Sequence, residues 1–151
     1  VALARAGVAE LVVTNRTAAR AADLAELLAS RGLGAGVRVV PWEAAELAGA
    51  LGGAELIINT TSVGMAPEAD ASPVELPSLA DGCWLVDLIY NPPRTRLMAA
   101  AEERGATARN GAGMLAWQGA LSLERWTGQR APAELMRDVL EAELARRLVA
   151  G

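Results

Sequence analysis

The stretch Glu10–Arg20, which reads ELVVTNRTAAR, joins an apolar strand to a helix through a polar turn. Consecutive branched residues suit a strand, and the strand is predicted over Glu10–Asn15. Thr17 is expected to cap a helix that runs from Ala18 to about Arg31. The helix is expected to turn three leucines inward, Leu24, Leu27 and Leu28. The stretch therefore predicts a strand, a polar turn and a helix in direct succession.

The same alternation continues along the chain. Val1–Gly7 reads as the end of a helix, so we expect the chain to begin inside a βαβ unit. Further strands are predicted at Val37–Val40, Glu55–Asn59, Trp84–Ile89 and Ala106–Arg109. Further helices are predicted at Glu43–Leu51, Thr95–Gly105, Met114–Trp126 and Ala133–Val149. Continuous apolar strands between helices indicate an α/β fold with a doubly wound parallel sheet covered on both faces.

The last 40 or so residues break this alternation, because two helices follow each other without a strand between them. We therefore expect an incomplete Rossmann-like domain over residues 1–110 and a helical element over residues 111–151 that packs elsewhere. The final helix has apolar residues at helical spacing, Met136, Val139, Leu140, Leu144 and Leu148.

The composition excludes several classes of protein. The chain is 52% hydrophobic and 21% charged, with a net charge of −4, and its cations are dispersed, which argues against nucleic-acid binding. No apolar run approaches the roughly 20 residues of a membrane span. The single cysteine, Cys83, fits a reducing cytoplasm and reads as a small core residue. We predict no metal site.

Two absences bear on catalysis. The chain has no histidine, and all 14 of its cations are arginine, so it has no lysine. Arginine stays protonated and is a poor proton shuttle. The chain is therefore poorly equipped to transfer protons by itself.

The turn Asn15–Arg20 lies where an open parallel sheet binds ligands, at the carboxyl end of a strand. NAD-selective folds usually carry Asp or Glu there to bind the ribose 2′-hydroxyl. Here Arg16 and Arg20 could instead bind a 2′-phosphate through charge-assisted hydrogen bonds worth about 1.5–3 kcal/mol each. The Thr17 hydroxyl and the first N–H groups of the helix would add to this pocket. The alternative is a capped turn with solvated arginines.

Three more polar clusters follow predicted strands, at Asn59–Met65 (NTTSVGM), Asp87–Thr95 (DLIYNPPRT) and Asn110–Gln118 (NGAGMLAWQ). In the first, small hydroxyl residues and a glycine let the backbone approach a flat ring. In the second, Asp87 interrupts an apolar strand and needs a hydrogen-bonded partner if it is buried. The third places Gln118 about one turn into a helix. Each cluster has a structural alternative: a polar loop, a turn with Thr95 as cap, and a solvated Gln118.

Together these motifs resemble the shikimate dehydrogenase family. NRTxxR, NTTSVGM, DLIYNPxxT and GxGMLxxQ stand in that family's order and at its usual separations, from Val1 to about Trp126. The resemblance implies a cofactor-binding half of an NADP-dependent enzyme that interconverts 3-dehydroshikimate and shikimate. It also implies that residues 111–151 pack against an N-terminal substrate domain.

The resemblance assigns roles to individual residues. Asn15, Arg16, Thr17 and Arg20 would hold the adenosine 2′-phosphate. Thr60, Thr61 and Ser62 would lie along the cofactor. Leu88 and Gly111 would lie near its nicotinamide end. Tyr90 and Gln118 would contact shikimate.

The family's Gly-rich pyrophosphate loop and its catalytic lysine–aspartate pair have no match in this sequence. We therefore expect no catalytic residue in this chain and no turnover by the chain alone. A quinate- or NAD-using relative and a non-catalytic nucleotide-binding module remain the alternatives. A homodimer is a further expectation.

Overall fold

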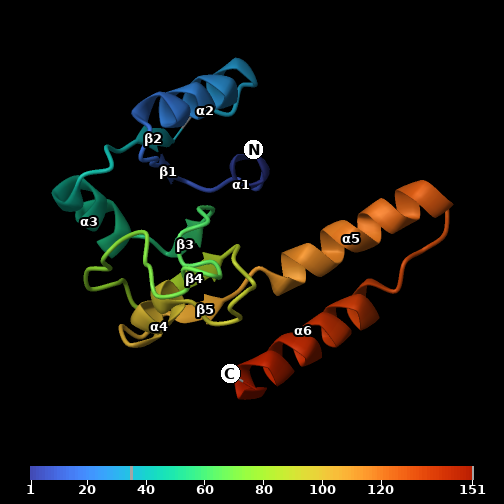
Figure 1. Ribbon diagram of the computed structural model, residues 1–151. Coiled ribbons are helices and arrows are strands. Elements are labelled where there is room, and N and C mark those ends of the chain that lie inside the picture. Colours follow the sequence, from blue (N-terminus) through green and yellow to red (C-terminus); the bar gives the residue numbers. More distant parts are fainter. Residues whose placement is uncertain (35, 151) are drawn as a thin grey trace. The chain divides into compact units, whose positions relative to one another are not determined.

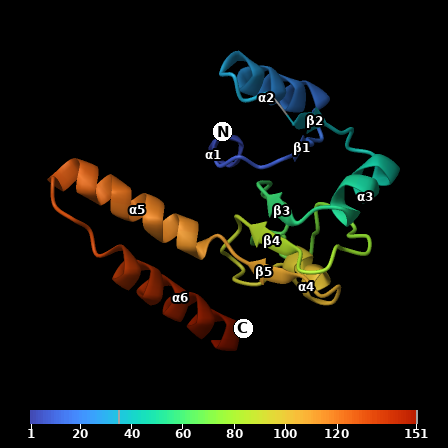
Figure 2. The same cartoon turned by 180° about the vertical axis from the view of Figure 1, so that it is seen from behind.

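The chain folds into two compact units in a computed structural model, residues Val1–Gly53 and Ala54–Gly151 (Figures 1 and 2). The structure describes residues 1–34 and 36–150, with side chains through Arg146 in the last helix.

The first unit is one short parallel sheet with its helices. Its elements are α1 (Ala2–Arg5), β1 (Leu11–Val13), α2 (Ala18–Ser30), β2 (Val37–Val39) and α3 (Ala44–Gly52). β1 and β2 pair in parallel, with Leu11 opposite Val37. Each strand is shorter than predicted, while α2 and α3 match the predicted helices to within one or two residues.

The packing of α2 corrects one prediction. Leu28 is fully buried, but Leu24 and Leu27 are 38% and 42% exposed, so the expectation that all three leucines face inward is wrong for two of them. Ala21 and Leu28 are the buried residues of α2. Because 3.6 residues make one turn, Ala21 and Leu28 lie on one narrow stripe, which a two-stranded sheet suffices to cover.

The second unit contains a three-stranded sheet in the order β3-β4-β5, formed by Leu56–Asn59, Trp84–Asp87 and Thr107–Arg109. Both pairings are parallel, as predicted, and Asn59 stands opposite Asp87 at the carboxyl ends of β3 and β4. The described strands thus form two sheets, one within each unit.

The helix α4 (Arg96–Glu102) covers one face of the three-stranded sheet. Its buried residues are Leu97, Met98 and Ala101, and the strands contribute buried Ile57, Leu85 and Ala108. Strand residues alternate between faces, so the residues beside these point the other way. On that side Leu56 and Trp84 are 42% and 44% exposed.

The chain ends in two long helices, α5 (Ala112–Thr127) and α6 (Ala133–Ala150), which pack side by side (Figure 1). Gly128 adopts the left-handed conformation that ends α5. The contact uses small residues, since Ala120, Ala131 and Ala133 form its buried cluster, with Met136 against it. In α6 Leu144 is buried, Val139 is 61% exposed, and the Leu148 side chain lies outside the described part.

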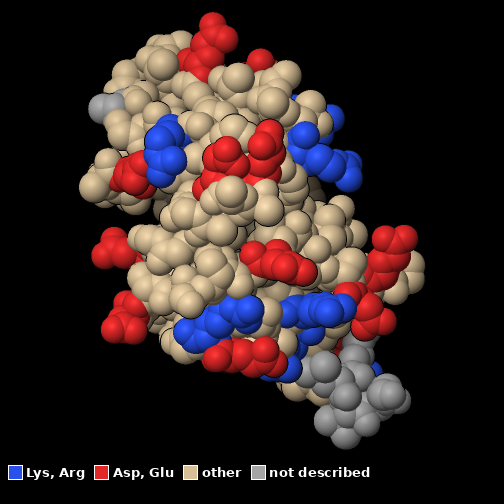
Figure 3. All heavy atoms as spheres, turned by 90° about the vertical axis from the view of Figure 1, so that its left-hand side faces the viewer, with Lys and Arg blue, Asp and Glu red and all other residues tan. Residues whose placement is uncertain are grey.

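Figure 3 shows acidic and basic side chains interspersed on one face of the molecule. Cys83 is buried, as predicted, and its burial raises the pKa of the thiol, which keeps it protonated at neutral pH. None of the described helices is both long and apolar enough to cross a membrane.

Candidate functional site

The turn after β1, Asn15–Arg20, is held by its asparagine and is named the arginine turn below. Asn15 Oδ1 accepts a hydrogen bond from the backbone N–H of Thr17 at 2.8 Å. Thr17 occupies the N-cap position of α2, as predicted, but its side chain accepts no bond from the helix. The predicted cap is therefore wrong in its chemistry: Asn15 has taken over the ordering of this turn, and the Thr17 hydroxyl makes no cap bond.

The two arginines of this turn project from the surface. Arg16 and Arg20 are exposed, and neither forms an ion pair or a side-chain hydrogen bond within residues 1–34 or 36–146. The segment from Asn15 to Ala22 contains no carboxylate. Two cations beside a helix N-terminus create a region of positive potential that suits a phosphate group.

In the second unit, the polar residues after β3 and β4 form one buried hydrogen-bonded group. Asn59 Nδ2 donates to Asp87 Oδ1 at 3.0 Å, and Thr95 Oγ1 donates to Asp87 Oδ2 at 2.7 Å. Thr61 donates to Asn59 Oδ1 through both its N–H, at 3.0 Å, and its hydroxyl, at 2.8 Å. The side chains of Asn59, Thr61, Asp87 and Thr95 are named the polar frame below.

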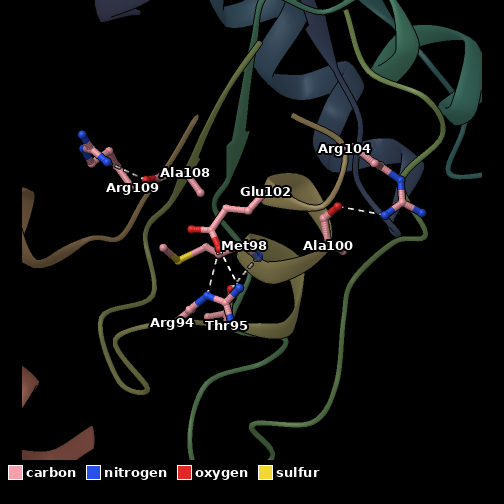
Figure 4. Close-up of polar contacts among 8 residues, drawn as sticks. All are labelled: Arg94, Thr95, Met98, Ala100, Glu102, Arg104, Ala108 and Arg109. Carbon is pink, nitrogen blue, oxygen red and sulfur yellow. Dashed lines mark hydrogen bonds and ion pairs between the residues drawn. The ribbon is translucent and has the colours of Figure 1, made fainter. Parts of the chain in front are cut away.

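The polar frame meets the requirement that the sequence set for Asp87. Its side chain is 0% exposed, and each oxygen accepts at least one hydrogen bond. Thr95 caps α4 as predicted, because its Oγ1 accepts the Met98 N–H at 3.2 Å (Figure 4). The structural role predicted for Thr95 is therefore confirmed.

The three hydroxyl residues assigned to the cofactor differ in their surroundings. Thr61 is half-buried and its hydroxyl also accepts the Val63 N–H at 3.2 Å, so this group belongs to the polar frame. Thr60 and Ser62, on either side of it, are exposed. Of the three hydroxyls, those of Thr60 and Ser62 are the ones left accessible to a ligand.

Leu88 and Gly111, both assigned to the nicotinamide end, lie against each other. A Cβ added at Gly111 would collide with the carbonyl oxygen of Leu88, so no other residue fits there without movement of the backbone. The Gly111 N–H also donates to the carbonyl of Ile89 at 3.0 Å. At Gly111 two segments of backbone thus come into close contact.

The two residues assigned to the substrate lie on different elements of this unit. Tyr90 is 38% exposed just beyond β4. Gln118 is exposed on α5, and its Nε2 donates to the Leu115 carbonyl of its own helix at 3.1 Å. No hydrogen bond joins Tyr90 to Gln118 among the described residues, so their shared role remains a prediction.

Asn110 was not singled out from the sequence, although it connects the second and third polar clusters of the unit, Asp87–Thr95 and Asn110–Gln118. Its Nδ2 donates to the Pro93 carbonyl at 2.8 Å, and its Oδ1 accepts the Ala112 N–H at 3.0 Å. The signal was available, because an Asx side chain that accepts the N–H two residues later recurs after four strands: Asn15, Asn59, Asp87 and Asn110.

Glu102, an acidic residue of α4, forms an ion pair at the surface. Figure 4 shows Arg94 donating through two nitrogens to Glu102 Oε2, at 2.9 and 2.7 Å. Both side chains are more than one-third exposed, at 54% and 39%. Within the described residues, no three Cys, Asp or Glu side chains gather as a metal site.

Comparison with known proteins gives the same family as the motifs. Residues 111–141 match the family model for the shikimate 5′-dehydrogenase C-terminal domain. The NADP(+) shikimate dehydrogenase of Methanopyrus kandleri is 43% identical over 139 residues, which cover 91% of this chain and 48% of that protein. The chain matches the C-terminal half of the shikimate dehydrogenase family. It spans about half the length of the curated relatives that it matches.

Solved structures of this family and its neighbours agree. The Thermus thermophilus shikimate 5-dehydrogenase in complex with NADP(H) and shikimate has a TM-score of 0.72 at 37% identity, covering 93% of this chain and 48% of that one. The quinate dehydrogenase of Corynebacterium glutamicum in complex with NAD has a TM-score of 0.81 at 26% identity, covering 93% and 49%. The Rossmann-like fold predicted from the alternation of strands and helices is therefore confirmed.

Proposed function

We propose that this chain is the cofactor-binding half of an NADP-dependent shikimate dehydrogenase, which reversibly reduces 3-dehydroshikimate to shikimate. The observation that carries the proposal is the conjunction of an arginine turn free of carboxylates with family motifs at the carboxyl ends of three parallel strands. Relatives with this name and this cofactor are 37–44% identical to the chain. A cytoplasmic location goes with this proposal.

The arginine turn supports NADP rather than NAD. A 2′-phosphate carries up to two negative charges, and Arg16, Arg20 and the N-terminus of α2 offer positive charge and donors without a competing carboxylate. The Thr17 hydroxyl makes no cap bond and is free to donate to the phosphate. These groups of the first unit would bind and orient the adenosine end.

The second unit would hold the reacting end. When bound, the nicotinamide supplies or accepts the hydride. The exposed hydroxyls of Thr60 and Ser62 would lie along the cofactor, with Thr61 holding their loop, and Leu88 and Gly111 would pack near the ring. Tyr90 and Gln118 would donate to the hydroxyl groups of shikimate.

Proton transfer would come from elsewhere. The chain has neither histidine nor lysine, and hydride transfer to a carbonyl needs a proton delivered to the oxygen. We assign that step to the lysine–aspartate pair that the family carries in its N-terminal half. Purified chain spanning Val1–Gly151 is therefore expected not to oxidise shikimate, and an enzyme-like rate from it would disprove this assignment.

The last two helices would pack against that N-terminal half. Large apolar side chains remain exposed on them, at Met114, Trp117, Leu121, Leu135 and Val139. An open hollow of about 540 Å³ lies between α5 and α6, lined among others by Trp117, Leu121, Pro132 and Leu135. Exposed apolar area of this kind marks a protein interface. Addition of the N-terminal half should bury Trp117 and blue-shift its fluorescence, whereas self-association of the chain alone would instead indicate a homodimer interface.

The direct test changes the arginine turn in a protein that joins this chain to an N-terminal half of the kind its relatives have. Arg16→Asp should weaken NADP+ binding about tenfold or more, because a charge-assisted bond is replaced by repulsion, and should leave NAD+ binding nearly unchanged. Arg31→Asp, at the other end of α2, is the matched control. Equal losses for the two cofactors would reject the 2′-phosphate assignment.

A second candidate, a quinate dehydrogenase, is favoured by the TM-score of 0.81 to such an enzyme in complex with NAD. The two functions separate by kcat/KM, measured for shikimate and quinate with each cofactor in the same joined protein. Preference for shikimate with NADP+ supports the first proposal, and preference for quinate with NAD+ supports the second. The third candidate, a non-catalytic nucleotide-binding module, predicts NADP+ binding without turnover even in the joined protein.

A further inference from the structure

Every group around the Asp87 carboxylate is a donor. Oδ1 accepts Asn59 Nδ2 at 3.0 Å and the Ile89 N–H at 3.1 Å, and Oδ2 accepts Thr95 Oγ1 at 2.7 Å. The side chain is fully buried, where an ionised carboxylate is costly unless such bonds compensate the loss of water. Asp87 therefore joins the ends of β3 and β4 and the start of α4 at one point.

The direction of these bonds is fixed by the next layer of contacts. Asn59 Oδ1 already accepts two bonds from Thr61, so the amide of Asn59 must turn its NH2 group toward Asp87. Thr95 Oγ1 already accepts the Met98 N–H, so its own proton is free for Asp87. Both oxygens of residue 87 must then be acceptors, and an asparagine there can satisfy only one side.

The polar frame continues into the loops to which the proposed function assigns ligand contacts. Through Asn59 it reaches Thr61 and the Val63 N–H, which fixes the loop that carries Thr60 and Ser62. Through the backbone of Ile89, whose N–H binds Asp87, it reaches Gly111, whose N–H donates to the Ile89 carbonyl. Tyr90 is the next residue along the chain from Ile89.

We propose that Asp87 is a positioning residue that sets the cofactor-side loop and the substrate-side loop together. Buried as it is, it acts through its neighbours: it fixes Thr60–Ser62 on one side and Tyr90 and Gly111 on the other. This inference rests on the proposed function for the roles of those loops. The hydrogen bonds themselves belong to the chain whatever its activity.

The first experiment measures amide hydrogen exchange by NMR in chain Val1–Gly151 carrying Asp87→Asn. We expect the Thr61, Val63 and Gly111 amides to exchange about tenfold or more faster, as the bonds that order them weaken. Amides inside α5 should stay within about twofold. Asp81→Asn, an exposed carboxylate in the turn before β4, is the matched control and should change neither set. A change confined to Ile89 and Met98, or one spread evenly over the unit, would overturn the proposal.

The second experiment is a double-mutant cycle on kcat/KM for shikimate in the joined protein. If Asp87 places Tyr90, then Tyr90→Phe should cost at least about threefold less in the Asp87→Asn background than in the unmodified protein. A merely structural loss would leave the two effects multiplicative, and that result would reject the positioning role. Thr95→Ser, which keeps the hydroxyl, should retain kcat/KM within about twofold, whereas Thr95→Val should reproduce the loss in Asp87→Asn.

The two experiments separate the inference from the function beneath it. If the joined protein oxidises no shikimate, the proposed function fails, and the exchange experiment alone decides whether Asp87 connects the loops. If shikimate is oxidised but the cycle is multiplicative, the function stands and the positioning role fails.

Discussion

The carboxyl ends of β1 and of β3 and β4 carry similar polar residues but use them differently. In the arginine turn, the asparagine is engaged and both arginines have no partner within residues 1–34 or 36–146. In the polar frame, every buried side-chain group has a partner inside the unit. The arginines of the turn are therefore available to a ligand, whereas the side chains of the polar frame bind one another.

This difference separates residues that are available to bind a ligand from residues that stabilise the fold. A buried polar group left without a partner costs about 1–3 kcal/mol, so the polar frame must be complete within the fold. An exposed arginine stays hydrated in the folded protein, so leaving it without a partner costs little folding free energy. Mutations in the polar frame are therefore expected to lower the stability of the fold, and mutations of the arginines in the arginine turn are expected to lower the affinity for a ligand.

Asp87→Ala should have the largest effect on stability. It removes the acceptor from three donors, Asn59 Nδ2, the Ile89 N–H and Thr95 Oγ1, in a site with no access for water. We expect the free energy of unfolding to fall by about 3 kcal/mol or more. Urea denaturation of chain Val1–Gly151, followed by tryptophan fluorescence, measures this. Asp81→Ala should cost less than about 0.5 kcal/mol, and equal costs at the two positions would show that the frame carries no special weight.

Gly111→Ala and Gly113→Ala form the next comparison. The added Cβ at Gly111 meets the Leu88 backbone, and we expect a loss of about 2 kcal/mol. At Gly113 it meets nothing within 4 Å, and alanine in the first turn of α5 should stabilise the chain by up to about 1 kcal/mol. Thermal unfolding of the two variants tests this. If both destabilise the chain alike, the close contact at Gly111 is not what requires glycine there.

Arg16→Gln combined with Arg20→Gln should leave stability unchanged. Neither side chain has a partner within the described part of the chain, so the free energy of unfolding should move by less than about 0.5 kcal/mol. The same double change should weaken NADP+ binding in the joined protein, as measured by calorimetry. A stability loss above 1 kcal/mol in urea denaturation would place the arginines in the fold rather than at a ligand.

Glu102→Gln should have only a small effect on stability. Its ion pair with Arg94 has good geometry, but both side chains are more than one-third exposed and are screened by water and salt. We expect a loss below about 1 kcal/mol that shrinks further at 1 M salt. Urea denaturation at low and high salt measures it, and a loss as large as that of Asp87→Ala would remove the distinction between surface and frame.

Elements with a strong local signal could be predicted from the sequence. Each predicted helix and strand is present, and Thr95 caps α4 as expected. The inward positions of α2 were less accessible, because Leu24 and Leu27 share their apolar character with Leu28 and only the narrow sheet decides which of them it covers. Likewise the sequence predicts parallel strands but not their division into two sheets, which depends on pairing over long separations.

The loops of the candidate site could be predicted from the sequence, but which of their side chains face a ligand and which bond within the fold could not. Asp87 was expected to need a buried partner, yet nothing in a one-dimensional pattern identifies Asn59 and Thr95 as those partners. Thr61 and Gly111 were assigned to the cofactor, and the fold engages both in internal contacts. Motif spacing locates the loops, whereas burial and donor direction tell which side chains in them are free.

The Asx side chains that follow four strands have a consequence for how the chain folds. Each of these bonds spans two residues, from Asn15, Asn59, Asp87 and Asn110, so closing it costs little chain entropy. Parallel strand pairing, by contrast, brings together residues 28 positions apart, such as Asn59 and Asp87, and is slow for that reason. The turns can thus form while the strands are still unpaired. Parallel strand pairing, the slow step, then begins with these four turns already ordered.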